Sequence, residues 1–301
     1  MTGLAFSRTL VVEKPAPACD LLASLTGLPK GRIKDCMLKG GVWWHKPGRS
    51  TTRLRRATSL VKPGEKLEIN YDSFLLSIRP GQPQLVAREA RYSVWNKPAG
   101  VLAQGTRFAD HCSLPRLVRT LLGLSADAHP VHRLDREAQG LALLAHDGRA
   151  AAQLGDLFRS GAVDKEYRVI VSGIPDWEMQ TSDQPLDGRP CRSHFKVLLT
   201  DPASATALLA AHIETGRKHQ IRRHLAAMGH AVVGDTLYGP RQSRRQALGL
   251  WATSLALNCP FTSGRLNWNL PSPDFPVVLP EIHRNAPARS KPFLEIQGVL
   301  D

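Results

Sequence analysis

The side chains best suited to chemistry lie in residues 130–147, where charged groups stand directly beside an apolar run. Asp135 lies among charged or titratable neighbours, and Gly140 then opens the run L-A-L-L-A. A short apolar run between a glycine and a polar turn is typical of a buried strand. We therefore expect Asp135 on a loop anchored in the core, which would hold one carboxylate still and leave it reachable. On this stretch alone, the commoner case is an aspartate that caps a turn or pairs with an adjacent arginine on a solvated loop.

A second group of polar residues occupies positions 214–225, E-T-G-R-K-H-Q-I-R-R-H-L. Ile221 and Leu225 are four residues apart, so they share one side of a helix that we expect to begin after Gly216. Arg222 and Arg223 point away from that apolar side, so that one of them can face a cleft. The residues alone predict no more than a basic helix end that faces RNA.

A strand is predicted at residues 165–171, K-E-Y-R-V-I-V, because charged residues alternate there with β-branched or aromatic ones. Tyr167 shares one face with Val169 and Val171, which makes it an inward residue. The usual reason for an inward tyrosine is core packing with a satisfied hydroxyl. The pattern by itself therefore favours a core role.

Together these motifs resemble those of the RluA family of RNA pseudouridine synthases. The stretch H-R-L-D that ends at Asp135, with Gly140 and its apolar run, resembles the family's signature, and N-K-P-A-G at residues 96–100 resembles its opening element. Residues 215–239, from T-G-R-K-H-Q-I-R to G-D-T-L-Y-G, match the family pattern almost position for position. The departures are A-Q at residues 138–139 in place of Thr-Ser, and Trp251 in place of a common histidine.

The resemblance implies roles for individual residues. Asp135 is the expected catalytic residue, Tyr167 is expected to stack on the target uracil, and Arg222 is expected to pair with the aspartate. Arg133 is a candidate to fill the gap that an extruded base leaves in the RNA. The further residues expected to bind substrate are His132, Arg217, His219, Gln220 and Ile221.

The reaction that the resemblance implies is the isomerisation of uridine in RNA. The glycosidic bond breaks, the uracil turns in place, and a ring carbon rejoins the ribose, with no cofactor and no metal. A paired or stacked base cannot be reached, so it must first be extruded into the site. The eleven histidines include no H-E-x-x-H motif and the five cysteines occur singly, so the sequence predicts no metal site.

Length and charge narrow the class of protein. A chain of 301 residues is about twice the length of a typical domain, which predicts two domains. The 40 Lys and Arg against 26 Asp and Glu give a net charge of +14, which points to a polyanion, most often nucleic acid. No apolar run approaches the roughly 20 residues of a membrane span, and the beginning of the chain lacks the order of a signal peptide. We expect a soluble, cytoplasmic monomer with no membrane partner.

Residues 20–72 predict two short helices followed by strands at residues 40–44 and 65–70. This order resembles the S4-like RNA-binding module that precedes the catalytic domain in many such synthases, although W-W-H-K-P-G at residues 43–48 replaces the usual turn. Most charge runs are solvated faces. Here the cations stand beside two tryptophans, one of which we expect in the core, and cations bind phosphates while aromatic rings stack on bases. The expected RNA-binding residues are Arg32, Lys34, Lys46, Arg49, Arg53, Arg55 and Arg56.

We therefore predict an α+β protein with an S4-like, small α/β RNA-binding domain at residues 1–78 and a linker at residues 79–86. A pseudouridine synthase catalytic domain with a mixed, mainly antiparallel sheet should follow at residues 87–301. We expect ribosomal RNA to be the substrate, because the N-terminal module resembles that of ribosomal RNA modifiers. Transfer RNA is the alternative substrate. One rival is an RNA-binding assembly factor without catalysis. Another is a glycosidase, for which Glu137 is the only strong candidate for the second carboxylate.

Overall fold

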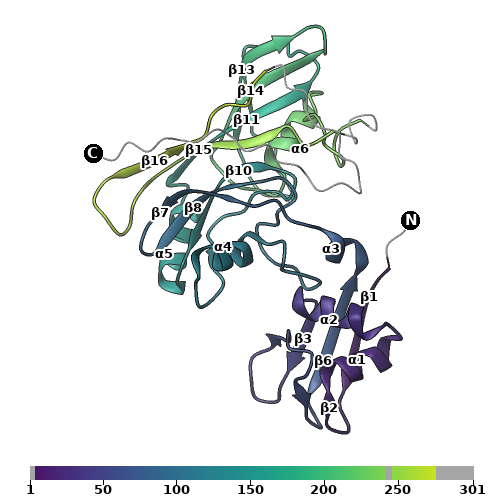
Figure 1. Ribbon diagram of the computed structural model, residues 1–301. Coiled ribbons are helices and arrows are strands. Elements are labelled where there is room, and N and C mark those ends of the chain that lie inside the picture. The colour runs from purple at the N-terminus through teal and green to yellow at the C-terminus, as the bar shows by residue number, and fades with distance from the viewer. Residues whose placement is uncertain (1–3, 241–245, 276–301) are drawn as a thin grey trace.

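The computed structural model describes residues 4–240 and 246–275, and it contains two main β-sheets. Residues 5–77 fold around the smaller sheet, here called the N-terminal module, and residues 84–269 build the larger one (Figure 1). The combination of helices with a mainly antiparallel sheet confirms the predicted α+β class. No helix among the described residues is long and apolar enough to cross a membrane.

The N-terminal module has an antiparallel sheet in the strand order β1-β6-β3-β4. Its strands are β1 (Ala5–Val11), β3 (Val42–His45), β4 (Thr52–Arg53) and β6 (Lys66–Asp72), and a short ribbon joins β2 (Ala16–Pro17) to β5 (Leu60–Val61). Three helices accompany them, α1 (Ala18–Thr26), α2 (Lys30–Leu38) and α3 (Ser73–Ser77). The two helices and two strands predicted within residues 20–72 thus form, because Leu22, Ile33 and Met37 meet Leu67 and Ile69 in one core.

The two tryptophans of β3 differ in their surroundings. Trp44 is partly buried and packs against the core of the module, but neither tryptophan is a buried core residue, so the prediction of one core tryptophan is met only in part. The indole of Trp43 instead donates a hydrogen bond of 2.9 Å to the carbonyl of Arg107, which lies on the far side of the predicted linker.

Residues 103–112 pack onto the N-terminal module, although they follow the linker in the sequence. Ala109 is fully buried in the module's core, and the amide of Asp110 donates to the carbonyl of Lys39 at 2.9 Å. A Cβ atom on Gly41 would lie 2.7 Å from the carbonyl oxygen of Phe108, so a larger residue at position 41 would push this segment away. The predicted division between residues 1–78 and 87–301 therefore omits a segment that completes the first unit.

The predicted linker at residues 79–86 is too long at its C-terminal end. Strand β7 (Gln84–Arg88) already pairs with β8 (Tyr92–Lys97) as the edge of the larger sheet. The polar residue Gln84 gave no sign of a strand in the sequence. An edge strand tolerates such a residue, because its side chains can stay exposed. The first strand of the larger sheet thus begins three residues before the predicted domain boundary at residue 87.

The larger sheet has the order β12-β13-β14-β11-β15-β10-β8-β7, with β16 added to β15 and β9 to β10. Among the described strands, every pairing in it is antiparallel apart from that of β10 with β15. The strands not yet given are β9 (His129–Pro130), β10 (Gln139–Ala145), β11 (Val163–Ser172), β12 (Met179–Ser182), β13 (Ser193–Asp201), β14 (Thr206–Ile213), β15 (Leu250–Asn258) and β16 (Arg265–Asn269).

Strand β10 forms the middle of this sheet and is buried on both faces. Ala142 and Leu144 join one apolar cluster, whereas Leu141 and Leu143 join another, which explains the unbroken apolar run in the sequence. Gly140 at its start has φ +110°, and a Cβ atom there would lie 2.2 Å from the carbonyl oxygen of Ala252. Only glycine fits where β10 first meets β15, so this contact fixes the end of the loop that carries Asp135.

Three helices pack around the larger sheet, α4 (Leu114–Leu122), α5 (Gly148–Arg159) and α6 (Gln220–Ala227) (Figure 1). The carboxylate of Asp147 caps α5 by accepting the amide hydrogen of Ala150 at 2.8 Å. The apolar side of α5 buries Ala150 and Leu154, whereas Ala152 is exposed.

Candidate active site

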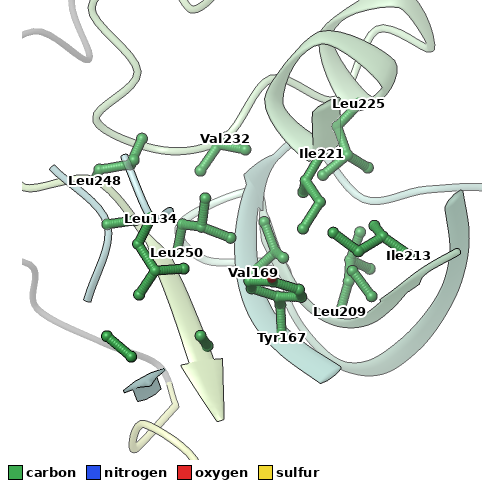
Figure 2. Packing of buried hydrophobic residues seen from close by; sticks show 14 of the residues in the cluster. Leu134, Tyr167, Val169, Leu209, Ile213, Ile221, Leu225, Val232, Leu248 and Leu250 are labelled. Carbon is green, nitrogen blue, oxygen red and sulfur yellow. The ribbon is translucent and has the colours of Figure 1, made fainter. Parts of the chain in front are cut away.

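Asp135 lies on a loop between β9 and β10 whose backbone is anchored on both sides of the carboxylate. The Leu134 side chain is 6% exposed and packs in the main apolar cluster (Figure 2). The carbonyl of Arg136 accepts hydrogen bonds from the amide of Gly100 at 2.8 Å and from Lys97 Nζ at 3.2 Å. The side chain of Asp135 remains 15% exposed, so the loop is held in place while the carboxylate is accessible.

Lys97 was not among the predicted site residues, although it stands in the N-K-P-A-G element. Its side chain is fully buried, and Nζ donates to the carbonyls of Pro98, Val101 and Arg136 at 3.1, 2.9 and 3.2 Å. Three acceptors match the three donors of an ammonium group. Burial lowers the pKa of Lys97 to about 7. Lys97 therefore ties the proline-glycine turn to the loop that carries Asp135.

Arg222 reaches the cleft from α6, which begins at Gln220, three residues later than the predicted start after Gly216. Its side chain is 3% exposed, and Nη1 donates to Asp135 Oδ2 at 3.0 Å. Of the two adjacent arginines, Arg222 is the one that faces the cleft. Arg223 instead pairs with Asp187 near the surface. The Arg222 guanidinium is buried with its two carboxylate partners rather than open to solvent.

Asp235 is the second partner of Arg222 and was also missed. It is fully buried and accepts from Arg222 Nε at 2.7 Å and Nη2 at 2.8 Å. Its Oδ1 also accepts the amide hydrogens of Leu237 and Tyr238. Burial opposes the ionised form of Asp235, but the hydrogen bonds from Arg222 and the two amides outweigh burial and lower its pKa. The G-D-T-L-Y-G motif was the available signal for this residue.

The charge of Arg222 is secured by these carboxylates. Burial acts to lower the pKa of Arg222, but hydrogen bonds and charge from Asp235, then from Asp135, outweigh it and raise the pKa. The guanidinium therefore stays positive and orients the Asp135 carboxylate through a charge-assisted bond.

His219 lies at the N-terminus of α6 in a left-handed conformation with φ +54°, which is rare for a residue with a side chain. This conformation brings its Nε2 to 3.6 Å from Asp135 Oδ1 and its Nδ1 to 3.0 Å from the hydroxyl of Tyr238. Burial lowers the pKa of His219 despite the opposing charge of Asp135, so the imidazole is neutral at pH 7. His219 therefore meets the carboxylate as a polar neighbour rather than as a cation.

Tyr167 lies on β11 and shares its inward face with Val169, as the alternation predicts (Figure 2). It is 8% exposed and lines the same cleft as Asp135. Burial raises the pKa of Tyr167, and the charge of Asp135 adds to this effect. The tyrosine is therefore a neutral phenol that combines a core position with access to the cleft.

The cleft has a volume of about 400 Å³ and lies between the Asp135 loop, β11, the end of α5 and the start of α6. Six of the predicted catalytic and substrate-binding residues line this cleft, where they can contact a ligand. They are Arg133, Asp135, Tyr167, Arg217, His219 and Arg222. Among them, Arg133 is exposed and makes no hydrogen bond or ion pair within the described part of the chain.

Three other predicted substrate-binding residues line the cleft but have internal functions. His132 stacks on Phe158 with ring centroids 4.4 Å apart, and its Nε2 accepts the amide hydrogen of Leu143 at 2.9 Å. Burial lowers its pKa to about 3, so this ring is neutral and fixed. Gln220 is 3% exposed, and both ends of its amide are bonded to the protein. Ile221 packs in the core beside Tyr167 (Figure 2).

The predicted RNA-binding residues of the N-terminal module separate into two groups. Arg53 and Arg55 pair with the buried carboxylate of Asp110, and the Arg53 guanidinium also lies 4.2 Å from the Trp43 ring. These two arginines hold residues 103–112 on the module instead of projecting into solvent. The other predicted residues lie at or near the surface and are Arg32, Lys34, Lys46, Arg49 and Arg56.

Comparisons with known proteins identify the class to which this fold and cleft belong. Residues 91–227 match the family model described as RNA pseudouridylate synthase. The chain is 36% identical to an uncharacterized RNA pseudouridine synthase of Mycobacterium bovis, over 90% of each chain. It is 31% identical to the dual-specificity RNA pseudouridine synthase RluA of Pasteurella multocida, over 64% of this chain and 95% of that one.

Two further matches concern substrate and fold. The chain is 33% identical to the ribosomal large subunit pseudouridine synthase D of Nitrosomonas europaea, over 53% of this chain and 52% of that one. The solved structure of human RNA pseudouridylate synthase domain containing 4 aligns with a TM-score of 0.54 and 25% identity, over 64% of this chain and 89% of that one. The protein is therefore a pseudouridine synthase, an isomerase that acts on RNA. Within that class, the chain belongs to the RluA family.

Proposed function

We propose that this enzyme isomerises specific uridines in structured RNA, preferably ribosomal RNA, with Asp135 as the catalytic group. The observation that carries the proposal is the 3.0 Å bond between Asp135 and Arg222 in a cleft that Tyr167 also lines. An accessible carboxylate beside a fixed positive charge can attack the ribose or the base, or take a proton from the sugar. No other aspartate lies among the residues that line this cleft.

The neighbours of Asp135 have distinct functions in this proposal. Arg222 orients the carboxylate, and Asp235 fixes Arg222 through two further bonds. The ring of Tyr167 supports the extruded uracil. Arg133, which is exposed at the mouth of the cleft, fills the gap that the base leaves in the RNA.

The N-terminal module is the proposed S4-like RNA-binding element. A surface hollow of about 270 Å³ is lined by Trp44, Lys46, Arg49 and Lys62, among others. Lys46 Nζ lies 3.6 Å from the centre of the Trp44 ring, so cations and an aromatic surface are adjacent there. This combination suits phosphates and unpaired bases of RNA. Ribosomal RNA is preferred because a relative bears a ribosomal large subunit name, and transfer RNA is the alternative.

The glycosidase alternative lacks a suitable second carboxylate among the residues that line the cleft. Glu137 pairs with Arg136, with an N···O distance of 2.7 Å, and does not line the cleft. Glu214 does reach the cleft, but its carboxylate pairs with His194 at 2.8 Å and is half exposed. A glycosidase needs two carboxylates that flank one bond.

We further propose that the enzyme acts as a monomer in the cytoplasm.

The test is to map pseudouridines in a strain that lacks the gene and then restore them with purified protein. Ribosomal and transfer RNA from that strain are incubated separately with the enzyme at matched uridine concentrations. We expect at least one ribosomal position to be lost in the strain and restored in vitro, with no restored position in transfer RNA. Restoration in transfer RNA alone would contradict the ribosomal preference, and free uracil in place of pseudouridine would contradict the reaction.

A further inference from the structure

The side of the cleft that faces α5 contains a lysine that the proposed chemistry does not use. Lys165 precedes Tyr167 by two residues and lies on the same face of β11, so the two backbones are about 7 Å apart along the strand. Lys165 is 8% exposed and lines the cleft together with Gly155 and Phe158 of α5. Its side chain is thus largely enclosed, and it lines the cleft beside the proposed position of the target base.

Lys165 has no internal partner within the described residues. It makes no hydrogen bond and no ion pair there, whereas Arg222 and Arg159, two other cations of the cleft, are paired with carboxylates. Arg133 and Lys218 also line the cleft without such a partner, but both are exposed to solvent, whereas Lys165 is buried. The two acidic residues adjacent to it in sequence, Asp164 and Glu166, lie on the opposite face of β11 and pair with Arg265 and Arg168. Burial lowers the pKa of Lys165, and only the charge of Asp164 opposes that shift.

A largely enclosed cation without a counter-charge is unfavourable, because it has lost part of its contact with water and gained no opposite charge in return. A neutral carbonyl of the base can accept a hydrogen bond from it but cannot cancel its charge. A phosphate oxygen can do both, and RNA carries one phosphate at every nucleotide. The charge, the enclosure and the position beside Tyr167 therefore fit a phosphate of the nucleotide whose base enters the cleft.

We propose that Lys165 is a substrate-binding residue that pairs with one backbone phosphate next to the target uridine and so holds the extruded nucleotide over Tyr167. The assignment rests on the proposed function, because it requires an extruded uridine in this cleft. It predicts that one phosphate near the target contributes more to binding than its neighbours, and that Lys165 is the reason.

The experiment pairs a protein change with a single change in the RNA. The probe is a synthetic oligoribonucleotide that spans a uridine isomerised by the parent enzyme, made with one uncharged methylphosphonate at each linkage near that uridine in turn. Parent, Lys165→Met, Lys165→Arg and the surface control Lys196→Met are compared by KM and kcat. Lys196 is exposed on β13 and lies outside the cleft.

We expect Lys165→Met to raise KM roughly 10- to 100-fold, the range for a hydrogen bond to a charged group, with a smaller change in kcat. One methylphosphonate should weaken the parent by a similar factor and leave Lys165→Met unchanged. Lys165→Arg should recover most of the affinity, and Lys196→Met should match the parent.

Two results would overturn the assignment while the isomerase function stands. One is an unchanged KM for Lys165→Met, and if kcat falls at the same time, the ammonium acts at the base rather than at a phosphate. The other is a loss with each methylphosphonate that is equal in parent and variant. If the parent isomerises no uridine in any RNA, the proposed function fails, and this assignment fails with it.

Discussion

Replacement of Asp235, the buried partner of Arg222, by asparagine should destabilise the protein more than the same replacement at Asp135. Asp235 is fully buried, and each of its oxygens accepts from the Arg222 guanidinium, at 2.7 and 2.8 Å. An asparagine would keep one acceptor but turn an NH₂ group toward Arg222 Nε. Arg222 would then be a buried cation with Asp135 as its single carboxylate partner.

The magnitude follows from that arrangement. Removal of one partner from a buried ion pair costs about 3 to 5 kcal/mol, because the other charge stays desolvated. Asp135→Asn should cost less, roughly 1 kcal/mol, since the Asp135 side chain is 15% exposed and gives Arg222 one bond instead of two. The expected order is therefore a large loss for Asp235→Asn and a small one for Asp135→Asn.

The assay is denaturant-induced unfolding at several pH values, with parent and both variants at equal concentration. The pKa of Asp235 in the folded protein lies below its ordinary value of 3.8, so the unfolded chain takes up the proton first as pH falls. The stabilisation by Asp235 is therefore complete above that value and is lost below it. The difference between parent and Asp235→Asn should be constant near neutrality and shrink in acid.

Equal losses for the two variants at pH 7, or a loss below 1 kcal/mol for Asp235→Asn, would refute this reasoning. Asp235→Glu serves as a control for charge without the native geometry. It should recover part of the lost free energy if charge is the main cause, and none if the loss reflects packing.

Three other predictions follow from contacts described above. Lys97→Met should cost roughly 1 to 3 kcal/mol at pH 7, because three buried carbonyls lose their donor. Between about pH 7 and pH 10.5 the unfolded chain keeps the proton of Lys97, whereas the folded protein has lost it. The free energy of unfolding of the parent should therefore rise with pH across this window relative to that of Lys97→Met. Asp110→Asn should loosen residues 103–112 from the N-terminal module, which faster amide exchange at Ala109 would reveal. Tyr167→Phe should keep most RNA affinity and lose most turnover, and near-normal turnover would return Tyr167 to a core role.

The resemblance to the RluA motifs was needed to single out the two charges at the centre of the site, Asp135 and Arg222, because the residues alone predicted only a loop carboxylate and a basic helix end. Short-range patterns did predict the elements that carry them, since the spacing of Ile221 and Leu225 defines one side of α6 and the apolar run after Gly140 forms β10. Lys97 and Asp235 were missed because their roles depend on distant partners. Lys97 bonds to Arg136, 39 residues away, and no periodicity encodes such a contact.

The same limit explains the errors outside the site. Arg53 and Arg55 were interpreted as RNA ligands because a charge run shows its sign but not its partner, and their partner Asp110 lies more than 50 residues along the chain. Residues 176–201 gave no pattern, yet they contain β12 and β13. Strand β12 and the second half of β13 are mostly exposed, so they lack the alternation that marks a half-buried strand.

The most direct test of the central claim is a single-turnover measurement of Asp135→Asn on an RNA that the parent isomerises. Asparagine keeps the shape of the side chain and its bond to Arg222 but has no negative charge. We predict no detectable pseudouridine in the variant, RNA binding close to that of the parent, and an unchanged fold by circular dichroism. Pseudouridine formed by Asp135→Asn at a rate near that of the parent would contradict the assignment of Asp135 as the catalytic group.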